Sequence, residues 1–201
     1  MANILLFGDS ITWWAFDEES WGWADRLKVD FMKNIENEWN LVYNLWIPGD
    51  ISSNLVKRFE AEAIFRDWDI VVVAIWINDS CFIQGYDINL VSREEFEKNL
   101  SKIHEISKKL RLQKLIFVWL TPVNETLVNP YPESSTWKSY KNKFIREYDE
   151  IIENFCWENN LDYIDLKNLI KIDELPDWLH PDSIWHEKIF EKVKNFLNRF
   201  F

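Results

Sequence analysis

The feature that most constrains the fold of this chain is a continuous apolar run, DIVVVAIW, at residues 69–76. The run is rich in β-branched Ile and Val, and it lacks the alternation of polar and apolar residues that marks a strand with one exposed face. A strand of this kind is buried on both faces, which is typical of a parallel sheet covered by helices on either side. The rest of the chain must therefore supply helices for both faces of a sheet.

The remaining sequence alternates between short apolar runs and amphipathic segments, as a covered parallel sheet requires. We predict strands at residues 3–7, 41–45, 69–76, 114–120 and 162–166. We predict helices at residues 21–38, 52–65, 92–110, 136–159 and 183–200. This order predicts a three-layer α/β/α fold around a parallel five-stranded sheet. Because no internal repeat, low-complexity tract or linker interrupts the order, residues 1–201 are expected to form a single domain.

The composition argues against several classes of protein. The formal net charge is −11, whereas binding to nucleic acid needs clustered Lys and Arg to neutralise phosphates. No apolar stretch approaches the ~18 residues of a membrane span, and the N-terminus lacks the basic region and cleavage site of a secretory signal. Two cysteines, Cys81 and Cys156, form no disulfide framework. We therefore expect a cytoplasmic enzyme or binding domain, with no nucleic-acid partner and no membrane span.

Polar motifs follow the predicted strands, at the edge where parallel sheets bind their ligands. The motifs are GDSIT at 8–12, NLWIPGD at 44–50, WIND at 76–79 and DWLHP at 177–181. Together they contain a hydroxyl, a glycine turn, an amide side chain and a carboxylate–imidazole pair. Acyl transfer needs a nucleophile, a base, an acid that orients the base, and donors for the oxyanion. These motifs therefore predict an acyl-transfer site.

The motifs, in this order, resemble the sequence blocks of the SGNH hydrolases, the family of GDSL-like lipases and acylhydrolases. The resemblance extends from Gly8 to Pro181. It implies a flavodoxin-like sheet and a serine esterase that hydrolyses carboxylic esters through an acyl-Ser10 intermediate. The implied substrate is a small-molecule, lipid or carbohydrate ester, and no metal or cofactor is implied. The Gly-x-Ser-x-Gly elbow of the α/β-hydrolases is absent from the sequence, which argues against that fold.

The resemblance also implies a role for individual residues. Ser10 is implied as the nucleophile, His180 as its base, and Asp177 as the acid that orients His180. The backbone N–H of Gly49 and the side-chain amide of Asn78 are implied as oxyanion donors. The position of Ser10 at a strand end also lets its own N–H point at the oxyanion. A separation of three residues lets Asp177 and His180 meet within one loop.

Other interpretations of these residues stay open at this point. Ser10 is also suited to capping the next helix, Asn78 to a turn, and Asp177 to the N-cap of a turn. A metal site on His180 and His186 lacks supporting Cys and suitable spacing. The alternatives in function are a carbohydrate deacetylase on the same fold, a non-catalytic binding domain, and a nucleotide binder, although the last lacks a Gly-rich phosphate loop. The sequence carries no signal for the acyl length, the alcohol or the oligomeric state.

The balance of tryptophan and glycine is unusual. The chain has 13 Trp and 4 Gly, whereas an average chain of this length has ~14 Gly. Trp46, Trp76, Trp178 and Trp185 stand where the family blocks have Gly. Either these tryptophans are genuine and fill the pocket, or they are UGA codons that encode Gly and were translated as Trp. The normal combined number of Gly and Trp favours the second explanation.

Overall fold

A computed structural model describes residues 2–13, 15–33, 40–119, 121–132, 134, 138–167, 169, 172 and 175–201. Within them, five parallel strands form the central sheet in the order β2-β1-β3-β6-β8. The strands are β1 (Asn3–Gly8), β2 (Leu41–Trp46), β3 (Ile70–Ala74), β6 (Lys114–Val118) and β8 (Asp162–Ile164). This is the flavodoxin-like strand order, so the predicted fold class is confirmed.

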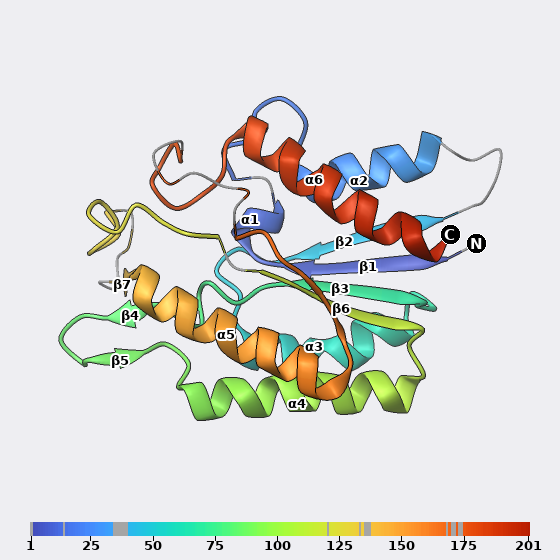
Figure 1. The fold of residues 1–201 in the computed structure, drawn as a ribbon, viewed down its shortest axis with the longest axis horizontal. Coiled ribbons are helices and arrows are strands. Elements are labelled where there is room, and N and C mark those ends of the chain that lie inside the picture. Colours follow the sequence, from blue (N-terminus) through green and yellow to red (C-terminus); the bar gives the residue numbers. More distant parts are fainter. Residues whose placement is uncertain are drawn as a thin grey trace.

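Helices cover both faces of the sheet, as Figure 1 shows. One face carries α2 (Gly22–Lys33) and α6 (Ser183–Leu197). The other face carries α3 (Ser52–Ile64), α4 (Arg93–Leu110) and α5 (Asn142–Asn159). No helix in the described residues is long and apolar enough to cross a membrane.

Side chains of the strands pack into two separate cores, because successive side chains of a strand point to opposite faces of the sheet. In β1, Ile4 and Leu6 pack into the core beneath α2 and α6. Leu5 and Phe7 pack into the other core, beneath α3, α4 and α5. The central run of β3 divides in the same way, which explains why its sequence is apolar at every position.

The segment before α5 differs from the sequence prediction. A helix was expected from residue 136, but residues 135–137 lie outside the described residues and α5 begins at Asn142. Between them, β7 (Lys138–Ser139) pairs with β4 (Phe82–Ile83), which also pairs with β5 (Ile88–Asn89). Strands of two residues have no periodicity for a sequence pattern to detect. The predicted end of the 21–38 helix also lies outside the described residues, and α6 ends in a 3₁₀ turn at Asn198–Phe200.

Several loops lie at one end of the sheet, next to the carboxyl ends of the strands. Figure 1 shows α1 (Ser10–Trp13), the loop before α6 and the small β4–β5–β7 sheet at that same end. The polar motifs predicted from the sequence lie on these loops, so the fold brings distant parts of the chain to one place.

Candidate active site

The turn between β1 and α1 presents Ser10 at the end of the sheet. Gly8 is required there, because a Cβ at this position would lie 2.0 Å from Thr12 Oγ1. The Thr12 hydroxyl is buried and donates to the carbonyl of Ala74 on the neighbouring strand at 3.4 Å. Ser10 is the first residue of α1, so its N–H has no acceptor within the helix. The tight turn therefore leaves both Oγ and N–H of Ser10 available.

Ser10, His180 and Asp177 form a continuous chain of hydrogen bonds. Ser10 Oγ lies 2.8 Å from His180 Nε2, and His180 Nδ1 lies 2.7 Å from Asp177 Oδ2. An ionised carboxylate only accepts hydrogen bonds, so Nδ1 carries the proton and Nε2 is left to accept from the Ser10 hydroxyl. The structure thus brings together the three residues that the motifs singled out, across 170 positions of sequence.

The loop that carries Asp177 and His180 is closed by its own hydrogen bonds. Asp177 Oδ1 accepts from the backbone N–H of His180 at 2.7 Å and from that of Leu179 at 3.1 Å. Burial by itself raises the pKa of the Asp177 carboxyl, but the hydrogen bonds and charge of His180 outweigh it and hold the pKa below its ordinary value. Asp177 is therefore ionised at neutral pH and can orient the imidazole.

The two other predicted oxyanion donors also lie at this end of the sheet. Gly49 occupies a turn in which the Asp50 N–H donates to the Ile47 carbonyl at 3.1 Å, and its φ of +73° is a conformation that favours glycine. Asn78 Nδ2 donates to the carbonyl of Asp50 at 3.1 Å and lies 3.5 Å from Asp9 Oδ2. Asn78 therefore contacts the neighbour of Gly49 and the neighbour of Ser10.

Two buried carboxyl groups belong to the sequence neighbours of Ser10 and Asn78. Burial raises the pKa of Asp9 to about 7, although the N–H of Ile11 and the nearby His180 oppose the change. Burial likewise raises the pKa of Asp79 to about 8, against hydrogen bonds from the N–H and hydroxyl of Ser52. Asp9 accepts the Ile11 N–H at 3.0 Å, so it braces the turn that holds the serine.

The remaining histidines do not contact Ser10. His186 Nδ1 accepts from the Trp23 N–H at 3.3 Å, Nε2 lies 3.4 Å from the Ala15 carbonyl, and burial lowers the pKa to about 4. His104, on α4, packs its ring against Phe155. Because both nitrogens of His186 are engaged by backbone groups, this residue holds the loop before α2 against α6.

The sequence interpretation missed three aromatic residues at the site. Tyr131 donates its hydroxyl to Asp177 Oδ2 at 2.9 Å, and Tyr140 donates to Asn78 Oδ1 at 3.0 Å. The Phe16 ring lies 5.6 Å from the His180 ring, measured between centroids. All three lie outside the long helices and strands, so no hydrophobic periodicity marks them. The one local sequence feature that could have indicated Tyr131 is its position between two prolines, in Pro130-Tyr131-Pro132.

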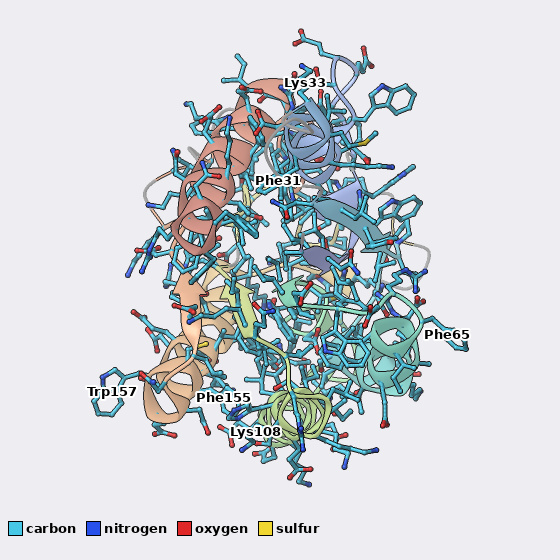
Figure 2. The ribbon with its side chains drawn as sticks, turned by 90° about the vertical axis from the view of Figure 1, so that its right-hand side faces the viewer. Phe31, Lys33, Phe65, Lys108, Phe155 and Trp157 are labelled. Carbon is cyan, nitrogen blue, oxygen red and sulfur yellow. The ribbon has the colours of Figure 1, made fainter. Side chains whose placement is uncertain are left out.

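Three of the tryptophans at glycine-like positions have energetically unfavourable features in the structure. Trp178 has a φ of +70°, in the left-handed region that favours glycine. Trp76 and Trp185 are almost fully buried, and their indole N–H groups have no hydrogen-bond partner among the described residues. By contrast, Trp157 points away from α5 into solvent, as Figure 2 shows. Trp76 and Trp185 pack in the two cores, one on each face of the sheet.

Comparisons with known proteins agree with this geometry. Residues 4–193 match the family described as GDSL-like Lipase/Acylhydrolase. A GDSL esterase/lipase of Arabidopsis thaliana is 29% identical over 188 residues, which cover 89% of this chain and 55% of that protein. The chain thus spans about half the length of this relative.

Solved structures share the fold over nearly the whole chain. A lipase/acylhydrolase from Enterococcus faecalis has a TM-score of 0.78 at 24% identity, covering 100% of this chain and 97% of that one. A catalytic mutant of an acetylxylan esterase from Geobacillus stearothermophilus has a TM-score of 0.71 at 20% identity, covering 98% and 93%. These likenesses establish the fold. The family match over residues 4–193 shows that the chain belongs to the GDSL-like lipases and acylhydrolases, a family of hydrolases that act on ester bonds.

Proposed function

We propose that this protein is a serine esterase in which Ser10 is the nucleophile, His180 the general base and Asp177 the orienting acid. The observation that supports this proposal best is the unbroken hydrogen-bond chain from Ser10 Oγ through His180 to Asp177. Ser10 and His180 alone would fit a capping hydroxyl beside a core histidine. The half-buried Asp177 carboxylate behind the imidazole is what distinguishes an activated serine from that arrangement.

The reaction divides into two acyl transfers. Ser10 Oγ attacks the ester carbonyl while His180 Nε2 takes the hydroxyl proton, and Asp177 stabilises the resulting imidazolium. His180 then returns the proton to the departing alcohol, which leaves an acyl-Ser10 ester. Water attacks this ester with His180 again as the base, and the carboxylic acid departs as Ser10 recovers its proton.

The oxyanion of each tetrahedral intermediate is assigned to three donors. These are the backbone N–H groups of Ser10 and Gly49 and the side-chain amide of Asn78. Tyr140 holds Asn78 Oδ1, which leaves Nδ2 turned toward Asp9 and the Asp50 carbonyl. The 3.5 Å contact with Asp9 Oδ2 is long for a hydrogen bond, so exchanging it for the oxyanion costs little. Each donor of this kind contributes about 10²–10³ in turnover.

A deacetylase acting on carbohydrate is the second candidate, because one similar structure is that of an acetylxylan esterase. Both candidates use the same chemistry and differ in the alcohol that leaves. Turnover of an acetylated xylooligosaccharide compared with p-nitrophenyl acetate distinguishes them. We also propose that residues 1–201 form one domain, since both cores are built on the same sheet.

The proposal is tested by hydrolysis of p-nitrophenyl acetate and by labelling with a fluorophosphonate. Ser10→Ala should lower turnover by on the order of 10⁶-fold and abolish labelling, because no other group replaces the activated hydroxyl. Ser101→Ala is the matched control, since Ser101 is exposed on α4 and donates to the Glu97 carbonyl. Undiminished turnover in Ser10→Ala, or labelling of another residue in the unmodified protein, would remove Ser10 from the mechanism.

A further inference from the structure

The Asp177 carboxylate receives more donors than a base-orienting acid requires. Its Oδ1 accepts the N–H groups of Leu179 and His180. Its Oδ2 accepts His180 Nδ1–H at 2.7 Å and also the Tyr131 hydroxyl at 2.9 Å. Two groups therefore share the one oxygen on which the imidazole depends.

Tyr131 reaches this oxygen from a segment that the fold holds in place. Its backbone N–H donates to the Lys138 carbonyl at 2.8 Å, which ties the loop to the start of β7. Its ring meets the Tyr140 ring edge to face, with centroids 6.1 Å apart and planes at 83°. Tyr140 in turn donates to Asn78 Oδ1. One segment between β6 and α5 thus delivers one hydroxyl to the acid and another to the oxyanion amide.

We propose that Tyr131 is a positioning residue that shares the Asp177 carboxylate with His180 and so limits how strongly that carboxylate holds the imidazolium. This inference rests on the proposed function of Asp177 and His180. The two backbone N–H groups on Oδ1 already fix the orientation of the carboxylate, so the hydroxyl acts mainly on the charge of Oδ2. A donor on a carboxylate oxygen stabilises its charge and makes it a weaker acceptor for a second donor. Tyr131 therefore weakens the stabilisation that the Asp177 carboxylate gives to the protonated imidazole of His180.

Among the other titratable groups around Asp177 and His180, three are neutral near pH 7 and one titrates there. Burial raises the pKa of Cys81 to about 11 and that of Tyr140 well above its ordinary value, and it lowers that of His186 to about 4, so all three are neutral near pH 7. Asp9, which interacts with His180, has its pKa raised to about 7 by burial and titrates in the working range. Asp9 is present in every variant below, so its contribution is the same in each comparison.

The experiment follows the His180 ring by NMR as pH is varied, in variants that each delete one hydroxyl. The chain has three histidines, which makes assignment practical. In Tyr131→Phe, His180 should take up its proton at a pH about 0.5 higher, which is about a threefold change in its protonation equilibrium. The acid limb of kcat/KM should move in the same direction. Tyr86→Phe is the matched control, because Tyr86 is 77% exposed. Tyr140→Phe removes a hydroxyl from Asn78 and should leave the His180 titration in place.

Replacing all tyrosines with 3-fluorotyrosine in the otherwise unmodified protein provides a second measurement, and its first step does not require Tyr131→Phe to fold. The fluorinated phenol is a stronger donor, so the His180 titration should move to lower pH, and the move should vanish when Tyr131→Phe is fluorinated. An unmoved or lowered His180 titration in folded Tyr131→Phe would overturn the inference, even if the esterase is active. Absence of ester hydrolysis would instead count against the proposed function and leave the NMR result interpretable.

Discussion

Replacing Trp178 by glycine should stabilise the loop that carries Asp177 and His180. Trp178 lies between them with a φ of +70°, and its carbonyl accepts the Asn124 N–H at 2.9 Å. A residue with a Cβ pays about 1–2 kcal/mol in the left-handed region, whereas glycine does not. Part of this gain is offset by about 0.4–1 kcal/mol, because glycine gains freedom in the unfolded chain. The net advantage of glycine over alanine at position 178 is therefore about 1 kcal/mol.

The sharpest assay compares Trp178→Gly with Trp178→Ala by thermal and chemical unfolding. Both variants lose the indole, so the difference between them isolates the backbone. At about 2–4 °C per kcal/mol for a chain of this size, the glycine variant should melt about 3 °C higher than the alanine variant. Trp157→Gly is the control, because Trp157 is 81% exposed and lies within helix α5. At this helical position, glycine should lower the free energy of unfolding by about 0.5 kcal/mol relative to the unmodified protein.

A glycine variant no more stable than the alanine variant would refute this reasoning. It would show that residue 178 is not strained, and it would remove one structural argument that this tryptophan occupies a glycine position. Coding DNA with TGG, the codon for Trp, at positions 46, 76, 178 and 185 would refute the mistranslation hypothesis itself.

Further expectations concern the histidines and the buried acid. His180→Ala should lose at least about 10³-fold in ester turnover while His104→Ala keeps it, and comparable losses would contradict the assignment of His180 as base. His186→Ala should instead lower the free energy of unfolding by about 1–3 kcal/mol, since it leaves buried backbone groups unpaired. Asp9 has a folded pKa of about 7, above its ordinary 3.8, so its contribution to stability is full below pH 4 and is lost as pH rises through 7. The stability of Asp9→Asn relative to the unmodified protein should therefore increase between pH 4 and pH 8 in urea unfolding, and a pH-independent difference would show that Asp9 does not titrate there.

Much of the fold was predictable because its elements obey local patterns. The predicted helix at 92–110 is α4, and the Ser92 hydroxyl caps it by accepting the Glu95 N–H. The run at 69–76 forms the central β3, and the apolar faces of the helices match the two cores. A local pattern does not show when a charged side chain is buried by the loop that carries it. Asp17 lies in the acidic run 17–19, yet it is buried, with the N–H groups of Glu19, Ser20 and Gly22 and the Arg26 guanidinium as donors.

The sequence by itself determined the strands of the sheet, their order along the chain and which residue types follow each strand, because these depend on periodicity and on short motifs. Only the tertiary structure decided which groups touch. Tyr131 meets Asp177 across 46 residues, and Tyr140 meets Asn78 across 62. The tertiary structure likewise decided the direction of the Asn78 amide and the left-handed backbone conformation of Trp178. Contacts of this kind are made by irregular loops whose paths depend on the packed sheet beneath them, and a loop has no repeating pattern from which its partner can be inferred.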